Sequence, residues 1–483
     1  MKAGFGILVA AVLASGCAST LQERATAAPC AAGAVHSEQR VTTSQGTIAY
    51  DVCAGTLSVA GDDGRPAADL FYTAYFAKYG DSQRPLSFVW NGGPGADSRL
   101  LHFEALGPRI FANGALTDNP ATPLAASDLV FLDPAGTGFS RAASAETASA
   151  LYGTVGDIAA TTRFIRDFRN IYAREMSPLY LFGESFGTWR AAGTAEALAD
   201  AGVRVAGIGL ISGGIPLGEE GDRALSRALS LPNRTATALA LNQLGPDLQS
   251  RGRAVVEEAT RWARTTWYPA LSDPIAIADA ERVRIVADLA RYHGMEPAQI
   301  DAGSLWISPR DFRTGLLDGE TLDVFDMRRT GAREGDLKEA AILSYYRDTL
   351  GYSAGKYAGI EIEALPVGAN WQYDQAPITE ESLARAMAGE GPPSPSQPWT
   401  RRAMRKLPAM RTFVAAGLYD SLNSCAANEA TVAALSPDIT ARFVLHCYEG
   451  GHMMYDDPAV GSQFGRDVIS FLNNSSDQPH KEP

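Results

Sequence analysis

The sequence predicts an α/β fold, with a mostly parallel central sheet and helices on both of its faces. Three observations predict it: short apolar runs bounded by turn residues, helical stretches between those runs, and a serine framed by glycines directly after one run. Strands that alternate with helices are typical of a doubly wound, largely parallel sheet. The runs that we expect to form buried strands are 86–90, 129–132, 179–182, 205–211, 412–416 and 443–445.

Helices are expected between these strands. Residues 157–173 have helical periodicity, because their apolar side chains recur at a spacing that places them on one stripe. Residues 191–201 continue a helix that follows the glycine-framed serine. From about residue 214 the alternation with strands stops, and the expected helices are 223–231, 253–267, 274–292 and 337–350. A proline-rich connector, 391–398, then precedes the last strands.

We therefore expect a mainly helical cap that is inserted into the core and covers its site. The expected division is a signal peptide over 1–17, a core formed by 30–213 and 399–475, the cap over 214–398, and a disordered tail over 476–483.

The composition favours a soluble protein that does not bind nucleic acid. The chain has 483 residues, of which 46% are hydrophobic and 20% charged. Its formal net charge of −13 argues against nucleic acid as a partner, since phosphate binding needs a basic surface. After the N-terminus, no apolar run approaches the ~20 residues that a membrane-spanning helix needs.

The N-terminus has the pattern of an export signal. Lys2 precedes an apolar run over 3–15, and small residues lead to Cys17. Residues 13–17 (L-A-S-G-C) resemble a bacterial lipobox, in which Cys17 would carry a lipid anchor. The leucine stands one place too early for that motif, so ordinary cleavage near 25–28 stays open. We expect a protein of the bacterial periplasm or a lipoprotein anchored to the outer membrane, or alternatively a secreted protein.

The other four cysteines favour disulfides in an exported chain. Four cysteines allow three pairings, and proximity in the sequence favours Cys30 with Cys53 and Cys425 with Cys447. Four isolated, buried thiols are the alternative. The second bridge would tie together the segments that carry Asp420 and His452.

Residues 183–187 (G-E-S-F-G) follow an apolar run and form the pattern of a nucleophile elbow, with Ser185 as the nucleophile. Asp420 follows the expected strand 412–416, and His452 lies in a G-G-H-M loop. The order Ser, Asp, His is that of α/β-hydrolases. The alternative base is His102, near the glycine-rich loop at 91–95.

Asp456 and Asp457 are alternative acids, although their place before a proline indicates a turn. Acyl transfer also needs two N–H groups for the developing oxyanion. In this fold they would come from Phe186 and from the glycine-rich loop, through Gly93. No His, Glu or Cys spacing matches a metal site, and we predict neither metal nor cofactor.

Five ordered motifs together resemble the serine carboxypeptidase family (peptidase family S10) of the α/β-hydrolase superfamily. They are residues 90–95 (W-N-G-G-P-G), 132–140 (L-D-P-A-G-T-G-F-S), 183–187, 417–420 (G-L-Y-D) and 450–453 (G-G-H-M). The resemblance covers about 70–475 and is loosest in the cap. Residues 370–371 and 448–455 look most like the bacterial branch of the family.

The resemblance implies the role of each matching residue. Ser185, Asp420 and His452 match the family's triad, with Gly93 and Phe186 as its oxyanion hole. Asn91 and Glu184 match the pair that binds the free C-terminal carboxylate of a peptide substrate. Gly92 is a further substrate-binding candidate, and Met453 matches a residue of the leaving-residue pocket. A protonated Glu184 can donate a hydrogen bond to that carboxylate, whereas an ionised one repels it, so such a site favours acidic pH.

The chain departs from the family pattern near this carboxylate site. The acid that usually partners the residue at Glu184 is replaced by Ala105, and the nearest acid is Glu104, which we take as a substrate-binding candidate. The cysteine expected after the glycine-rich loop is absent, because Ala96 stands there. Arg99 either attracts a carboxylate or is a solvated surface residue, and the second interpretation is favoured.

We expect an exported serine carboxypeptidase that releases C-terminal residues from peptides through an acyl-enzyme. The alternative is a serine esterase or acyltransferase on the same fold. A catalytically silent binding protein of the cell surface is a third reading, which the intact Ser185, Asp420 and His452 argue against. The sequence predicts no oligomeric state.

Overall fold

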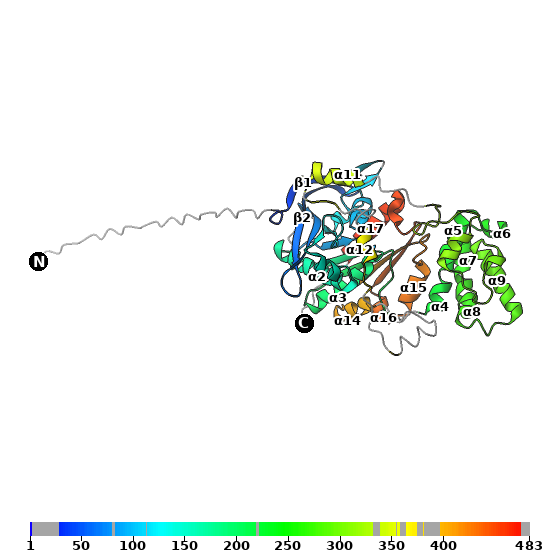
Figure 1. Ribbon diagram of the computed structural model, residues 1–483. Coiled ribbons are helices and arrows are strands. Elements are labelled where there is room, and N and C mark those ends of the chain that lie inside the picture. Colours follow the sequence, from blue (N-terminus) through cyan, green and yellow to red (C-terminus); the bar gives the residue numbers. More distant parts are fainter. Residues whose placement is uncertain are drawn as a thin grey trace.

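The structure is a computed structural model, and one central sheet organises it (Figure 1). It describes residues 29–79, 83–112, 114–218, 222–331, 339–353, 355–357, 364–373 and 397–474, with Met1 and Glu380. The ten-stranded sheet has the order β1-β2-β3-β7-β4-β9-β10-β11-β12, and β8 pairs with β3. Its strands are β1 Val35–Thr43, β2 Gly46–Ala60, β3 Pro66–Ala77, β4 Leu86–Trp90, β7 Asp128–Leu132, β8 Arg141–Ala142, β9 Leu179–Glu184, β10 Gly207–Ile211, β11 Arg411–Gly417 and β12 Phe443–Tyr448. A separate two-stranded sheet consists of β5 Arg109–Ala112 and β6 Ala115–Asp118.

The part of the sheet from β7 to β12 is parallel, and each of its strands coincides with an apolar run of the sequence. β7, β4, β9, β10 and all but the first residue of β11 are buried on both faces, which explains why they are continuously apolar rather than alternating, whereas β12 at the edge is mostly half-buried. Within β9, Leu179 and Leu181 pack into one hydrophobic cluster, whereas Tyr180 and Phe182 pack into the cluster on the opposite face. The predicted α/β class and the mostly parallel sheet are confirmed.

Helices cover both faces of the sheet. On one face lie α2 Thr154–Ile171, α3 Gly187–Asp200 and α14 Trp399–Lys406, which contribute to the first cluster. On the other lie α17 Pro458–Asn474, the π-helix η1 Leu101–Leu106 and the π-helix η5 Tyr345–Thr349. Shorter elements around the core are α1 Ala145–Leu151, η2 Pro123–Ala125, α11 Glu339–Ser344, α12 Ala364–Ala369, α15 Cys425–Ala433, α16 Pro437–Thr440 and η6 Met454–Asp456.

The three N-terminal strands were not predicted from the sequence. β1, β2 and β3 pair antiparallel, and β3 joins the parallel part through an antiparallel pairing with β7. β1 alternates between exposed and half-buried residues and contains charged side chains, so it lacks the apolar run that identified the other strands.

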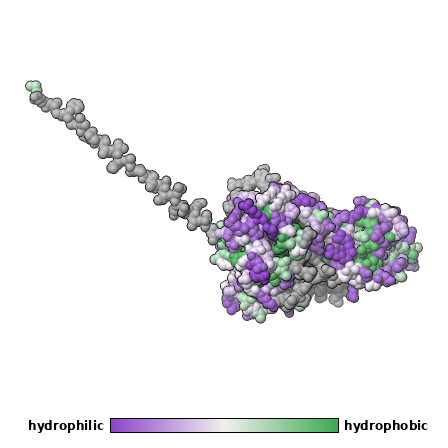
Figure 2. All heavy atoms as spheres, turned by 90° about the horizontal axis from the view of Figure 1, so that it is seen from above, coloured by the Kyte–Doolittle hydropathy of each residue, from purple (hydrophilic) through white to green (hydrophobic). Residues whose placement is uncertain are grey.

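The helices between residues 223 and 315 pack around a hydrophobic cluster of their own, in which Trp267 is fully buried. They are α4 Arg223–Ala228, α5 Leu231–Ala240, α6 Pro246–Gln249, α7 Ala254–Trp262, η3 Ala263–Trp267, α8 Tyr268–Ser272, α9 Asp279–His293, η4 Pro297–Gln299 and α10 Pro309–Gly315. They stand beside one end of the sheet, next to α15 (Figure 1). Seen from above, hydrophilic residues are spread over both parts of the molecule, with smaller hydrophobic groups between them (Figure 2). The boundaries 213/214 and 398/399 stay a prediction.

Two disulfides close loops of the core. Cys30 is bonded to Cys53, and Cys425 is bonded to Cys447, which are the pairings that sequence proximity favours. The described residues contain no helix that is both long and apolar enough to cross a membrane. The lipobox with Cys17 and the tail 476–483 lie outside the described residues.

Candidate active site

Ser185 lies in the turn between β9 and α3, in a backbone conformation that few residues other than glycine adopt. Its φ is +56°, and its amide donates to Ile211 O at 2.8 Å. A Cβ on Gly183 would lie 1.9 Å from the carbonyl oxygen of Gly187, so the turn is too tight there for any side chain. Positive φ at a residue with a side chain is a strained state that is found at functional sites. The turn leaves Ser185 half-exposed among buried neighbours.

Asp420 and His452 form a buried pair. His452 Nδ1 is 2.8 Å from Asp420 Oδ2, and the two residues are 3% and 1% exposed. Leu422 N and Asn423 Nδ2 donate to the carboxylate at 2.8 and 2.9 Å and fix its orientation. Burial lowers the pKa of His452, but the charges of Asp420 and Glu184 more than offset it, and the pKa lies above its ordinary value.

Ser185 does not form a hydrogen bond with His452 in this structure. Within the described residues, His452 Nε2 is buried and has no hydrogen-bond partner. The imidazole nevertheless interacts electrostatically with Glu184, the residue directly before Ser185. The hydrogen bond between a nucleophilic serine and its base is often long in enzymes without substrate and shortens in the complex with substrate.

The glycine-rich loop after β4 is docked against the elbow. A Cβ on Gly92 would lie 2.5 Å from Phe186 N and 2.6 Å from Glu184 O, so only glycine allows this approach. Gly93 has a φ of +95°. Among the described residues, no group accepts a hydrogen bond from the amide of Gly93 or Phe186. Two unpaired amides at one place suit an oxyanion.

Two residues that the sequence analysis did not identify hold this loop. Trp90 Nε1 donates to Gly187 O at 3.0 Å, and Arg190 Nη1 donates to Asn91 O at 2.7 Å. Arg190 is fully buried and pairs with Asp157 at 2.6 Å. Its position three residues after Gly187 gave no signal in the sequence, because the ion pair joins α3 to α2.

Glu184 lies at the centre of a buried hydrogen-bonded group. Asn91 Nδ2 donates to Glu184 Oε2, and Tyr455 OH donates to Oε1 at 2.7 Å. Asn91 Oδ1 accepts from Leu101 N at 3.1 Å, which turns the amide donor toward the carboxyl group. Burial raises the pKa of Glu184 to about 7 and the charge of Glu104 adds to this, although His452, Tyr455 and Asn91 oppose it.

Of the remaining candidate residues, two lie at this site and one lies in the core. Glu104, on η1, acts on Glu184 through its charge, and Met453 is buried beside His452. His102 is instead a core residue, because it is stacked 4.0 Å from Phe131 and its Nε2 is 2.7 Å from Tyr75 OH. Burial lowers its pKa well below the ordinary value.

The two alternative acids have other partners. Asp457 accepts from Ala459 N at 2.8 Å at the start of α17, and Asp456 lies 3.7 Å from Arg329. Neither is the acid paired with His452. Tyr455, between His452 and these acids, was missed, because nothing in the local sequence distinguishes it from a packed aromatic residue.

The interpretation of Arg99 as a solvated surface residue is wrong. Arg99 is 3% exposed, and its Nε pairs with Asp97 at 3.1 Å. Asp133, in the D-x-P-x-G-x-G-F-S segment, accepts from Ser98 N and Oγ at 2.9 and 2.7 Å. Burial and then the charge of Asp97 raise the pKa of Asp133 to about 7. The residues after the glycine-rich loop are therefore held by a buried polar network.

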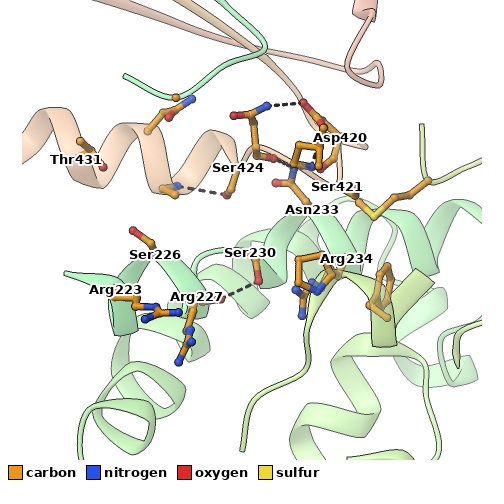
Figure 3. A pocket seen from close by; sticks show the side chains of 18 of the residues that line it. Arg223, Ser226, Arg227, Ser230, Asn233, Arg234, Asp420, Ser421, Ser424 and Thr431 are labelled. Atoms are coloured by element: carbon orange, nitrogen blue, oxygen red, sulfur yellow. Dashed lines mark hydrogen bonds between the residues drawn. The ribbon is translucent and has the colours of Figure 1, made fainter. Parts of the chain in front are cut away.

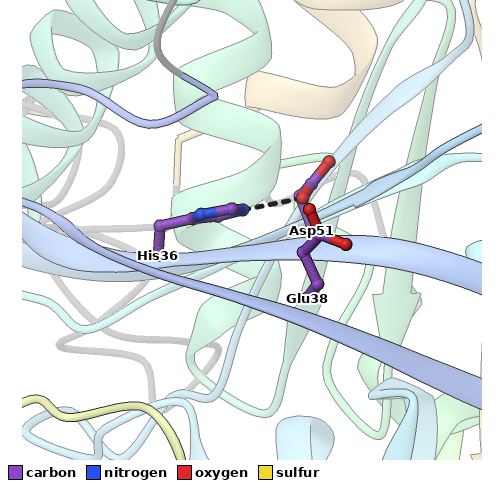
Figure 4. Close-up of side chains that lie close together, drawn as sticks. All are labelled: His36, Glu38 and Asp51. Atoms are coloured by element: carbon purple, nitrogen blue, oxygen red, sulfur yellow. Dashed lines mark hydrogen bonds and ion pairs between the residues drawn. The ribbon is translucent and has the colours of Figure 1, made fainter.

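One group of metal-type ligands occurs within the described part of the chain, and it lies away from this site. It consists of His36, Glu38 and Asp51 on β1 and β2 (Figure 4). Lys78 Nζ lies 2.8 Å from Glu38 and 3.3 Å from Asp51, so an ammonium group already neutralises these carboxylates. The group is an ion-pair network at the surface.

Comparison with known proteins agrees with this arrangement. Residues 47–201 match the model of the family described as serine carboxypeptidase. This segment includes the glycine-rich loop and the elbow with Ser185. No match is found among curated protein sequences.

Solved structures extend the likeness to most of the chain. Similar to it is KEX1(delta)p, a prohormone-processing carboxypeptidase from Saccharomyces cerevisiae, with a TM-score of 0.52 and 14% identity over 88% of this chain and 91% of that one. The haloalkane dehalogenase DbeA from Bradyrhizobium elkani has a TM-score of 0.39 and 14% identity, over 88% and 99%. The fold comparison rests on the yeast carboxypeptidase, and at 14% identity this likeness concerns the fold alone. Residues 47–201 therefore match the serine carboxypeptidase family, and the chain has the α/β-hydrolase fold.

Proposed function

We propose that the protein is an exported serine carboxypeptidase in which Ser185, His452 and Asp420 form the triad that releases C-terminal residues from peptides. One observation carries the proposal beyond the family. A buried carboxyl group, Glu184, directly precedes the elbow serine and is held by Asn91 and Tyr455. An esterase has no use for a protonated carboxyl group at this place, whereas a carboxypeptidase needs a donor for the substrate's terminal carboxylate.

The proposed reaction uses these groups in turn. Ser185 Oγ attacks the carbonyl carbon of the last peptide bond while His452 Nε2 takes its proton, and Asp420 holds the imidazole in the required tautomer. The amides of Gly93 and Phe186 stabilise the oxyanion. His452 then gives its proton to the leaving nitrogen. In the second half of the reaction water attacks the acyl group while His452 takes its proton, and His452 returns that proton to Ser185 Oγ as the acyl group leaves.

Recognition of the chain end depends on the protonation of Glu184. Its pKa, raised to about 7, keeps the carboxyl group neutral in acidic and near-neutral solution. The neutral form can donate a hydrogen bond to the substrate carboxylate beside Asn91. Above pH 7 the ionised form repels the substrate, which gives the enzyme an upper pH limit.

The segment around Phe325, in the middle of the chain, contacts His452. His452 N donates to Phe325 O at 2.6 Å, and the ring of Phe325 lies 5.3 Å from the imidazole. We infer that the inserted segment 214–398 acts as a cap that shapes the substrate pockets. Export is supported by the two disulfides, which persist in oxidising compartments. The bacterial branch, the lipid anchor at Cys17 and an outer-membrane location remain part of this proposal.

Hydrolysis of an N-blocked dipeptide and of its C-terminal amide, from pH 4 to 8, tests the proposal. The expected result is much faster cleavage of the free acid, with no cleavage by Ser185→Ala. Equal rates on acid and amide, or activity on simple esters alone, would favour the esterase or acyltransferase. Full biological activity of Ser185→Ala would favour a silent binding protein.

A further inference from the structure

A cavity lies next to Asp420, the residue that pairs with His452. It has a volume of about 380 Å³ and is lined by α4, α5, the start of α15 and the chain after β11. Pockets that bind small molecules begin at about this size. Neither Ser185 nor His452 lines it, but Asp420 and Ser421 do (Figure 3).

Three arginines line this cavity in a chain whose net charge is −13. Arg223 and Arg227 lie four residues apart on α4, and Arg234 follows on α5 (Figure 3). In the part of the chain that the structure describes, no ion pair joins Arg227 or Arg234 to an acidic side chain. Arg234 is only 3% exposed, and its Nη1 donates to Ile307 O at 2.8 Å. Burial lowers the pKa of Arg234 to about 9, although the charge of Asp311 opposes this.

An indole holds two of the guanidinium groups in place. The Cζ atoms of Arg227 and Arg234 lie 4.8 and 5.3 Å from the centre of the Trp306 ring. Burial lowers the pKa of Arg227, and the neighbouring charge of Arg223 lowers it further. Two cations that repel each other on one wall of a cavity are stabilised by an anion between them.

Two side-chain atoms at the cavity lack hydrogen-bond partners within the described residues. They are Asn233 Oδ1 and Asn428 Nδ2, and Asn233 is 2% exposed. The Asn233 amide cannot be turned around, because its Nδ2 donates to the carbonyl oxygens of Gly417, Asp420 and Asn423. Both atoms are buried and do not open onto the cavity, so the groups that a ligand can meet there are the guanidinium groups, which favour an acid group.

We propose that this cavity binds a small organic oxyanion through its arginines. The ligand is distinct from the peptide at Ser185. Because Asn233 connects the cavity to the backbone of Asp420, occupation of the cavity also acts on the loop that orients His452.

Binding of four probes to the full chain tests the proposal, by calorimetry at constant ionic strength. L-malate and glycerol 3-phosphate each carry an acid group and a hydroxyl, succinate lacks the hydroxyl, and malamide lacks the charge. The expected result is saturable binding of malate, of glycerol 3-phosphate or of both, with the tighter one identifying the acid group. Succinate, which keeps both acid groups, binds as malate does, and malamide, which lacks the charge, does not bind.

Arg227→Gln should weaken binding about tenfold or more, since a hydrogen bond to a charged group is lost. Arg223→Gln provides a second variant on the same helix. Arg264→Gln is the matched control, because Arg264 is an exposed arginine of the same helical region that does not line the cavity. Absence of binding by both hydroxy acids, or an equal loss in Arg264→Gln, would overturn the proposal. The binding assay does not depend on peptidase activity, so it is independent of the proposed function.

Discussion

Replacing Glu184 with glutamine should remove the upper pH limit of the enzyme while leaving its preference for a free carboxylate. Glutamine keeps the shape of a protonated glutamate and keeps an N–H donor, but it cannot ionise. In the wild-type protein the neutral fraction of a group with a pKa of about 7 falls about tenfold between pH 6 and pH 8. The ratio of kcat/KM for a free-acid substrate to that for its amide should therefore fall by about the same factor.

Taking this ratio separates the effect of Glu184 ionisation from that of His452, the proposed base. Protonation of His452, whose pKa is raised, lowers the rate on both substrates below its pKa and cancels in the ratio. In Glu184→Gln the ratio should be flat from pH 6 to pH 8. Tyr455→Phe supplies a smaller change in the same direction. The tyrosine hydrogen bond lowers the pKa of Glu184, so its loss raises that pKa and moves the limit to higher pH.

Stability provides a second measure of the same shift. The folded pKa of Glu184 lies above its unfolded value of 4.5, so the folded state binds more protons between these values, and the free energy of unfolding falls as the pH rises from 4.5 through 7. The shift corresponds to roughly 3 kcal/mol, which Glu184→Gln should recover at pH 8. A pH profile and a stability in Glu184→Gln that match the wild type would refute this account of the carboxylate site.

Three further changes test other parts of the site. Asp420→Asn should lower kcat about 10⁴-fold with little change in KM, because the imidazole adopts the wrong tautomer; steady-state kinetics measures this, and a loss below tenfold would contradict the assignment. Gly92→Ala should abolish activity in a protein that still folds, because its Cβ would lie 2.5 Å from Phe186 N. Circular dichroism measures folding and a kinetic assay measures activity, and a near-normal kcat would contradict this prediction. Removal of either disulfide by paired Cys→Ser substitutions should cost about 3 kcal/mol in denaturant unfolding, since the sequence separations are 23 and 22 residues, but only loss of Cys425–Cys447 should lower kcat. Equal kcat in both double variants would show that this bridge does not support the His452 loop.

The parallel half of the sheet could be predicted because burial on both faces leaves a continuous apolar signal. The runs at 86–90 and 179–182 became β4 and β9, which flank each other in the sheet and end at the glycine-rich loop and the elbow. The antiparallel β1 was not predicted, because it is half-exposed and its pattern is mixed. Helix boundaries in the middle of the chain also differed: the stretch 223–231 divides into α4 and α5, with a proline in the first turn of α5.

Residues whose role depends on burial or on contacts with distant segments of the chain gave no usable signal in the sequence. Arg99 has the sequence context of a surface arginine, yet it is buried against Asp97. Tyr455 became part of the site only because the loop after His452 folds back onto Glu184, 271 residues away along the chain. Motif spacing identifies side chains on glycine-framed turns, whereas the partners of Glu184 depend on how separate segments pack.

The most direct test of the central claim is mass spectrometry of an unblocked peptide incubated with the enzyme and followed in time. The account predicts a ladder that shortens from the C-terminus one residue at a time. It predicts no ladder from the C-terminally amidated peptide, and none with Ser185→Ala. Internal cleavage, removal of residues from the N-terminus, or equal digestion of the amidated peptide would contradict the claim that Ser185 acts beside a carboxylate-binding Glu184.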